Sequence, residues 1–254
     1  MYNMAKNSAN EIPEKNFLRD YDASHYARPN ITVDVAIFTV QDGALKVLIV
    51  KRSAHPCKGD WALPGGFIDI CLDADLNDAA LRKLREKTGV ASPYLEQFAT
   101  FGNDKRDPRG WSVTTVYFAL LPNAGLAASS EKGFEQSKWA TVGQGGTIND
   151  RLAFDHAEIL AGCVARLRNK VLYTSLPLYL MPETFTLGEL QKVHELILGT
   201  DLEHKSFRRR ILGAELLEET DLFRHEAKRP ARLYRLKTGA PHIFNRIIEG
   251  TRRA

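Results

Sequence analysis

The chain has 254 residues, of which 44% are hydrophobic and 26% charged, and its formal net charge is +4. This composition excludes a disordered protein, and the length favours two modest domains over one large one. The polar start of the chain lacks the apolar stretch of a signal peptide, and no run of about 18 apolar residues follows, so we expect a soluble cytosolic protein without membrane contact.

The charge is divided unevenly along the chain. Residues 1–164 carry 18 Lys and Arg against 20 Asp and Glu, whereas residues 165–254 carry 17 against 11. A nucleic-acid footprint requires such a local surplus, so the C-terminal third is the part expected to meet nucleic acid. The three cysteines, Cys57, Cys71 and Cys163, are too scattered for a disulfide framework or a paired zinc motif, and we predict reduced thiols.

The first part of the chain alternates strand and helix patterns. Residues 31–50 predict a β-hairpin with its turn at Asp42-Gly43. Residues 75–87 predict a helix of about three turns. Gly89 is expected to end it, because glycine readily adopts the left-handed conformation of a helix C-cap. Residues 113–121 predict a further strand, and residues 155–169 an amphipathic helix that closes the domain.

These patterns divide the chain into four parts. The predicted boundaries are an N-terminal arm at 1–30, a first domain at 31–170, a connector at 171–182 with two prolines, and a second domain at 183–254. The expected fold class is therefore α+β.

Residues 62–90, ALPGGFIDICLDADLNDAALRKLREKTGV, resemble the Nudix box. The resemblance implies an α/β/α sandwich in which helix glutamates hold Mg²⁺ against a pyrophosphate. Aligned on Arg82, two of those glutamates are replaced by Lys83 and Lys87, and only Glu86 is kept. The earlier glutamate of the box falls near Ala74, and the loop from Gly66 to Arg82 is longer than the box prescribes.

The two lysines reverse the local field, so Glu86 alone should hold Mg²⁺ poorly and no metal site is expected. We predict a pocket that binds a diphosphate without cleaving it, with the lysines in place of the metal. The alternative is that Lys83 and Lys87, four residues apart, form a solvated basic stripe on the helix. The ligand-binding residues predicted from the box are Gly65, Gly66, Phe67, Lys83, Glu86 and Lys87.

A second basic cluster, DKRDPRGW at 104–111, precedes the strand at 113–121. Guanidinium groups suit bidentate phosphate or ribose contacts, but a loop of this composition is by itself more often a solvated turn. The Asp-Pro-Arg-Gly loop resembles that of the ADP-ribose-handling branch of the Nudix superfamily, and this resemblance implies ligand contacts for Arg106, Asp107 and Arg109. Arg52, at the end of the second strand, is a further candidate, with an ordinary surface strand end as its alternative.

The second domain begins with a capping-box pattern, Thr186-x-x-Glu189, ahead of a helix at 184–197. In the following run, 201–220, Asp201 is expected to cap a second, basic helix that buries Leu202, Phe207, Ile211 and Leu212. Residues 222–236 predict two short strands with basic residues at their tip. The order helix, helix, hairpin is that of a winged helix-turn-helix domain. The predicted DNA contacts are Thr186, His204, Lys205, Ser206, Arg208, Arg209, Lys228, Arg229 and Arg232.

The alternative for this domain is a small helical dimerisation module with a charged outer face. Together, however, the two halves resemble the NrtR family, Nudix-related bacterial regulators of NAD metabolism, and the LQKVHELILG…SFRRRIL stretch is the more specific half of the match. The resemblance implies a homodimeric repressor of NAD metabolism genes on a near-palindromic DNA operator in the bacterial cytosol, at the nucleoid. It also implies ADP-ribose, or a related NAD derivative, as effector and no required cofactor.

Two other functions remain open from the sequence. An active ADP-ribose pyrophosphatase with an accessory C-terminal domain would need Asp73, Asp75 and Glu86 as makeshift metal ligands, and Mg²⁺-dependent turnover would reveal it. An inert scaffold that only dimerises would bind neither nucleotide nor DNA. The lysines in the box favour the non-enzymatic sensor over both, because they disfavour the metal yet keep a counter-charge for phosphate.

Overall fold

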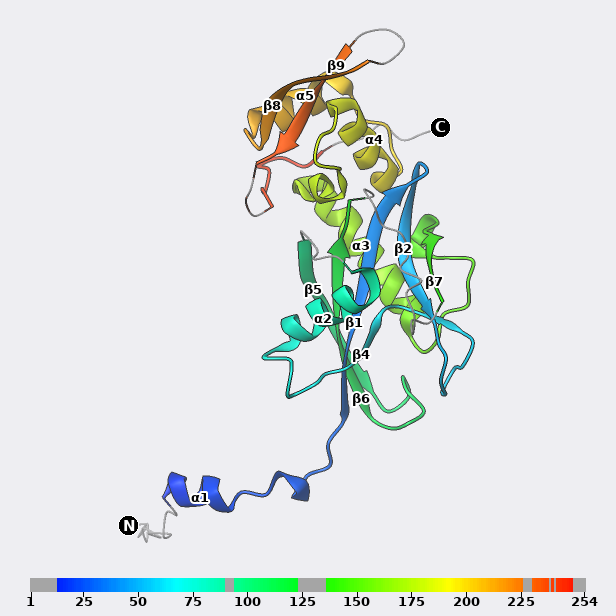
Figure 1. The fold of residues 1–254 in the computed structure, drawn as a ribbon, viewed down its shortest axis with the longest axis vertical. Coiled ribbons are helices and arrows are strands. Elements are labelled where there is room, and N and C mark those ends of the chain that lie inside the picture. The colour runs from blue at the N-terminus through cyan, green and yellow to red at the C-terminus, as the bar shows by residue number, and fades with distance from the viewer. Residues whose placement is uncertain are drawn as a thin grey trace, which may run out of the picture.

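The computed structural model describes residues 13–89, 94–122, 136–225, 230–237, 239 and 241–248. Within these residues, the larger part of the fold is a seven-stranded sheet whose central path runs β3-β2-β1-β6-β5, with β4 beside β1 and β7 beside β2 (Figure 1). Its strands are β1 (Asn30–Gln41), β2 (Ala44–Lys51), β3 (Trp61–Ala62), β4 (Gly65–Phe67), β5 (Tyr94–Asn103), β6 (Ser112–Leu120) and β7 (Ser137–Thr141). The helices on this sheet are α2 (Leu76–Thr88) and α3 (His156–Tyr173), with the short 3₁₀ helix η2 (Gln144–Gly146) before α3.

The predicted hairpin is confirmed. β1 and β2 pair antiparallel, and both turn residues, Asp42 and Gly43, have positive φ angles of 53° and 69°. Two positive φ angles give the turn a twist that matches the right-handed twist of the flanking strands. The predicted helix is confirmed as α2, which Asp75 caps at its start and Gly89 ends at a φ of 67°.

One helix covers each face of the sheet. Successive side chains of a strand point to opposite faces, so Val35 and Ile37 of β1 pack under α2 around Leu84, whereas Ala36 and Phe38 pack under α3. This arrangement is an α/β/α sandwich, as the Nudix resemblance implied. β1 and β6 run parallel at its centre, and together they carry the pocket described below.

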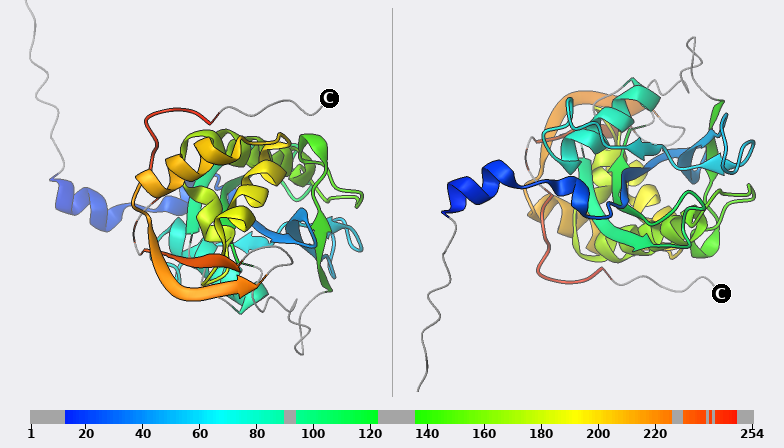
Figure 2. Two further views of the ribbon diagram at one scale, coloured as in Figure 1. Left: turned by 90° about the horizontal axis from the view of Figure 1, so that it is seen from above. Right: turned by 90° about the horizontal axis from the view of Figure 1, so that it is seen from below.

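A second unit stacks on one end of the sandwich and consists of α4 (Leu187–Leu198), α5 (His204–Gly213), β8 (Leu217–His225) and β9 (Pro230–Leu236) (Figures 1 and 2). The predicted capping box of α4 is confirmed, because the Thr186 hydroxyl accepts the Glu189 N–H at 3.1 Å and the Glu189 carboxylate accepts the Thr186 N–H at 2.8 Å. β8 and β9 pair antiparallel as predicted. Their tip, with Lys228 and Arg229, lies outside the described residues.

Two details of the second helix were predicted wrongly. The N-cap is Glu203 and not Asp201, because the Leu202 N–H is held by the Glu195 carboxylate at 2.9 Å and the helix begins only after it. Leu212 is exposed, because it lies one residue off the stripe that faces the core. The other residues predicted to be buried here are buried: Leu202, Phe207 and Ile211.

The segment predicted as a connector contains the last turn of α3 and a 3₁₀ helix, η3 (Leu176–Leu180). It does not cross solvent, because all residues from 176 to 181 are buried. All of them except Pro177 belong to one hydrophobic cluster that extends from Phe38 in the sheet to Phe207 in α5. The sandwich and the second unit therefore share one core, and the domain boundaries drawn from the sequence stay a prediction.

The N-terminal segment carries α1 (Glu14–Asp20), which has no buried residue, and η1 (Ala23–His25). Figures 1 and 2 show α1 projecting from the end of the sandwich opposite the second unit. Of the helices in the described part of the chain, none combines the length and apolarity needed to span a lipid bilayer.

Candidate functional site

A polar pocket of about 180 Å³ opens between β1, β4 and the loop that precedes β6. We call it the Gly65 pocket. Eight of the ten predicted ligand-binding residues line it, and Lys83 and Glu86 do not. Its full lining is Thr32, Asp34, Val50, Arg52, Ala62, Leu63, Gly65, Gly66, Phe67, Lys87, Arg106, Asp107, Arg109, Phe154 and His156.

The glycine pair has a packing reason of its own. A Cβ on Gly65 would lie 2.1 Å from the Asp34 Oδ1 atom, so no larger residue fits between β4 and β1. Gly66 has a φ of +147°, which L side chains rarely adopt, and a Cβ there would lie 3.4 Å from the Lys83 Cε atom. The turn therefore brings the backbone of Gly66 close to the stem of Lys83.

Glu86, the carboxylate kept from the Nudix box, is occupied by neighbouring cations. Its Oε1 atom accepts from Arg82 at 2.9 Å and its Oε2 atom accepts from Lys83 at 3.1 Å. Partial burial acts to raise the pKa of Glu86, but these two hydrogen bonds outweigh it and hold the pKa below its usual value. Lys83 thus neutralises the last helix carboxylate instead of pointing freely into the pocket.

Asp73, one of the makeshift metal ligands considered above, is held in the same way. Arg82 donates to both of its carboxylate oxygens at 2.6 and 2.7 Å, which lowers the pKa of Asp73 to about 2. Across the described residues, no group of three or more His, Cys, Asp or Glu side chains is arranged to hold a metal ion.

Arg106 was predicted to bind ligand from a loop, and its side chain is only 5% exposed. Its guanidinium donates to both oxygens of Asp155, the residue before α3, at 2.9 and 3.0 Å, and lies 3.8 Å from Asp34. A buried charge is tolerated only when it is paired in this way. Arg106 still lines the pocket, but as a fixed positive wall and not as a mobile arm.

Asp34 and His156 lie beside Arg106 in the pocket lining and were not predicted from the sequence. The Thr114 hydroxyl donates to Asp34 at 2.7 Å, and the Leu63 N–H donates to His156 Nδ1 at 2.9 Å. Burial lowers the pKa of His156 despite the nearby Asp34, so the ring is neutral. The available signal was Asp34 itself, an acidic residue inside the apolar strand ITVDVAIF.

The mouth of the pocket combines cations with aromatic rings. Arg109 is bound by Asp107 at 2.7 Å and lies 5.1 Å from the centre of the Phe67 ring. Arg52 lies 4.6 Å from the Phe154 ring centre and donates to the Pro56 carbonyl at 2.9 Å. Guanidinium groups beside aromatic faces suit a ligand that joins phosphate to a flat ring system.

The predicted DNA-binding residues fall mainly on α5. Lys205, Ser206 and Arg209 are exposed along this helix, and Arg208 is half-buried. Among the described residues, no carboxylate forms an ion pair with Lys205, Arg208 or Arg209, so their charge faces solvent. His204 is exposed but contacts the Gln191 amide oxygen at 2.8 Å.

The remaining predicted contacts are placed differently. Thr186 is buried and its hydroxyl serves the α4 cap, while Arg232 on β9 pairs with Glu219 of β8. The structure adds Arg224 of β8, which pairs with the capping residue Glu189 and so ties the hairpin to the start of α4. None of these contacts identifies a base reader, and the assignment of individual DNA contacts stays a prediction.

Comparison with protein families gives two matches. The NUDIX domain matches residues 30–163, and the NrtR DNA-binding winged helix domain matches residues 177–236. The ADPR responsive transcriptional repressor NtrR of Acinetobacter baylyi is 51% identical over 222 residues, which cover 87% of this chain and 88% of the relative.

Two solved structures of Shewanella oneidensis NrtR are also similar. One, in complex with a 27mer DNA, is 44% identical, with a TM-score of 0.76 over 86% of this chain and 99% of that one. The other is its NUDIX domain in complex with ADP ribose, which is 41% identical, with a TM-score of 0.55 over 61% of this chain and 99% of that one. With a Nudix sandwich and a winged helix in one chain, and with these relatives over most of its length, the chain belongs to the NrtR family of Nudix-related transcriptional regulators.

Proposed function

We propose that this protein is a transcriptional repressor whose affinity for operator DNA is set by ADP-ribose bound in the Gly65 pocket. The observation that carries the proposal is the pairing, in one chain, of this cationic, aromatic pocket with an unpaired basic face on α5. Family relatives were crystallised with DNA and with ADP ribose, which supports both halves. Genes of NAD metabolism are the proposed targets, and a homodimer on a near-palindromic operator in the bacterial cytosol is the proposed working form.

Within this proposal the Nudix domain binds and does not hydrolyse. Two of the box glutamates are lysines, and the third, Glu86, is bonded to Lys83 and Arg82. A divalent cation would have to displace two cations to reach it, at an electrostatic cost that its remaining ligands do not offset. ADP-ribose binding should therefore be unchanged by EDTA, and no cofactor is required.

In place of a metal, the pocket offers fixed positive charge. Arg106 is held by Asp155, and Arg109 is held by Asp107, so both guanidinium groups are positioned before ligand arrives. Preorganised donors lose little conformational entropy on binding, which favours affinity for a diphosphate. Phe67 and Phe154 lie beside these cations and provide faces for the ring systems of the nucleotide.

The test is fluorescence polarisation with the purified full chain. Labelled duplexes from upstream of its own gene and of neighbouring NAD metabolism genes are titrated with protein, and ADP-ribose is then added at micromolar concentration. We expect at least one duplex to bind and its affinity to change with ADP-ribose. Binding that ADP-ribose leaves unchanged would contradict the effector role, and Mg²⁺-dependent release of AMP from ADP-ribose would support the hydrolase instead.

A further inference from the structure

Arg210 of α5 makes contacts that reach out of the winged helix. Its guanidinium donates to the Leu172 carbonyl in the last turn of α3 at 3.1 Å and to the Arg246 carbonyl in the C-terminal segment. The same group lies 3.9 Å from the centre of the Phe244 ring. Arg210 therefore joins the basic helix of the DNA-binding unit to the final helix of the Nudix sandwich.

The C-terminal segment that Arg210 grips is itself attached to α3. We call residues 241–248 the C-terminal strap. Its Phe244 N–H donates to the Tyr173 carbonyl and its Ile248 N–H donates to the Leu172 carbonyl, both at 2.8 Å. The strap lies outside the region matched by the winged-helix family. Arg210 thus holds a single unit made of the end of α3 and the strap.

The charge of Arg210 has no carboxylate partner in the part of the chain that the structure describes. Among the described residues, no Asp or Glu side chain pairs with it, burial lowers its pKa, and its Nε atom is buried without a hydrogen-bond partner. Two carbonyl dipoles and one ring face hold the group instead. Such contacts weaken steeply with distance and angle, so a small shift of α3 changes how well Arg210 is held.

The opposite end of α3 forms part of the Gly65 pocket. Asp155, which precedes the helix, binds Arg106, and His156, its first residue, lines the pocket and accepts from Leu63. The 18 residues of α3 span about 27 Å at the rise of an α-helix. The helix α3 therefore has its first residue at the Gly65 pocket and its last turn at Arg210.

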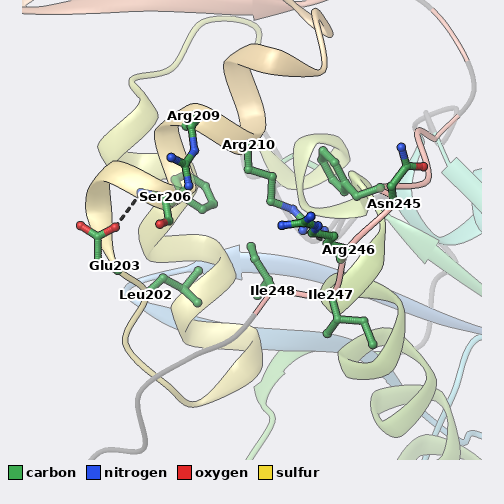
Figure 3. A pocket seen from close by; sticks show the side chains of 11 residues that line it. Leu202, Glu203, Ser206, Arg209, Arg210, Asn245, Arg246, Ile247 and Ile248 are labelled. Atoms are coloured by element: carbon green, nitrogen blue, oxygen red, sulfur yellow. Dashed lines mark hydrogen bonds between the residues drawn. The ribbon is translucent and has the colours of Figure 1, made fainter.

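α5 also has room to move on the side that faces the strap. A cavity of about 880 Å³ lies between this face and the strap, and Figure 3 shows Arg210 crossing it between α5 and Arg246. Ser206 and Arg209 of the helix line the same space. Phe207 and Ile211 pack the other side of α5 into the core, so on the side that faces the strap the few groups that bridge the cavity add to this packing in setting the position of the helix.

We propose that Arg210 is the positioning residue that transmits the state of the Gly65 pocket, through α3, to the DNA-binding helix α5. This inference rests on the proposed function and names the contact that couples its two sites. A ligand that shifts Asp155 and His156 at the start of α3 also shifts Leu172 at its end. Through its hydrogen bond to the Leu172 carbonyl, Arg210 then changes the position of α5. The coupling is a difference in operator affinity between the free and ligand-bound protein, and it is reciprocal.

The test compares the full chain with Arg210→Gln and Arg168→Gln. Arg168 of α3 donates to the Ile197 carbonyl of α4 at 3.1 Å, so it makes the same kind of contact without touching α5. Operator affinity is measured by fluorescence polarisation with and without ADP-ribose, and ADP-ribose affinity by calorimetry on protein without DNA. The probe is the duplex that the wild-type chain binds best.

We expect Arg210→Gln to keep the ADP-ribose affinity of the wild type within about two-fold and to lower the coupling factor by at least about five-fold, the low end of typical allosteric couplings. Arg168→Gln should change the coupling factor by less than about two-fold. Full coupling in Arg210→Gln, or equal losses in both variants, would overturn the role of Arg210. A wild-type chain without any coupling would instead overturn the proposed function.

Hydrogen exchange on the wild-type chain provides a measurement that survives a folding defect in the variant. ADP-ribose is expected to change the exchange rates of backbone amides in α5 and in the strap, besides those around the Gly65 pocket. Exchange that changes only around the pocket, while operator affinity still responds to ADP-ribose, would overturn the proposed route.

Discussion

The Gly65 pocket and α5 use positive charge in opposite ways. In the Gly65 pocket Arg106 and Arg109 are each bound by a carboxylate, whereas the α5 residues Lys205, Arg208 and Arg209 have no such partner among the described residues. Bound cations form a rigid site of defined shape, and solvated cations can exchange their counterions for phosphates. The difference indicates one region built for selectivity towards a small ligand and another built for affinity to a polyanion.

Breaking the pocket's ion pair should have the largest effect. Asp155→Ala leaves Arg106 buried without its main partner, and such losses cost about 3–5 kcal/mol of stability. Chemical denaturation should show this loss. The matched control is Asp150→Ala, whose partner Lys138 is 44% exposed, and it should cost less than about 1 kcal/mol. Equal costs would mean that the buried pair has no special role.

The two regions also differ in their buried histidines. His156 in the pocket faces Asp34. His194 of α4 is 1% exposed, its Nδ1 atom contacts the Leu190 carbonyl, and its Nε2 atom has no hydrogen-bond partner among the described residues. Burial lowers the pKa of His194 to about 4 from 6.5. Protonation therefore favours the unfolded chain, so the stability contribution is complete above about pH 6.5 and is lost as the pH falls towards 4.

We expect the free energy of unfolding to fall with acidification in this window, by at most about 1.4 kcal/mol per pH unit from this group. Replacing the ring by His194→Leu should reduce the slope between pH 6.5 and 4 and leave the contribution of His156, whose pKa burial also lowers. His25→Leu, on the exposed N-terminal segment, serves as control and should leave it unchanged. A slope that persists in His194→Leu would assign the acid sensitivity to other groups.

Substitution of the solvated cations of α5 should change the affinity for DNA and leave the stability of the protein unchanged. Arg209→Ala is expected to weaken operator binding by about 1–3 kcal/mol if the residue reads a base. If it contacts a phosphate, the slope of log affinity against log salt should become less negative by about 0.9. Thermal unfolding should stay unchanged, as should operator binding by the control Arg19→Ala on α1. Unaltered binding by Arg209→Ala would count against α5 as the DNA-contacting helix.

The smallest effect is expected at the mouth of the pocket. Phe67→Ala removes the ring beside Arg109, and a cation–π contact at an exposed site is worth about 0.5–1 kcal/mol. Calorimetry should show ADP-ribose binding a few-fold weaker, with operator affinity in the absence of ligand unchanged. Ile70→Ala, at a nearby and 86% exposed position, should bind ADP-ribose like the wild type. An effect on ligand-free DNA binding would contradict the separation of the two regions.

The sequence predicts the elements of this fold where the signal is local. The Asp42-Gly43 turn, the α4 capping box and the Gly89 cap each depend on residues within a few positions, and all three are confirmed. Asp201 was predicted wrongly as a cap because the competing contact, Glu195 to Leu202, comes from another helix. A propensity cannot report a contact that exists only after the chain has folded.

The same limit applies to the site. Residue types together with the resemblance of the loop at 104–111 to the ADP-ribose-handling branch predicted ligand contacts for Arg106 and Arg109, and both line the pocket. That Asp155 binds Arg106, 49 positions away, has no local signature. The hydrogen bond from Arg210 to the Leu172 carbonyl is equally non-local. The strap, which also contacts Arg210, contains no sequence motif that would predict this contact. The polar contacts between residues far apart in the sequence are therefore the part of the site that could not be predicted.

The unbroken core beneath α4 limits how this protein can be recombined. The apolar residues of η3 pack with the sheet and with the winged helix at once, so a grafted winged helix from another protein would have to match both surfaces. A chimera cut at the family boundary near residue 177 would expose part of this cluster and lose solubility. Changes of operator preference during evolution should therefore occur as single substitutions on the exposed side of α5, with the domain itself inherited whole.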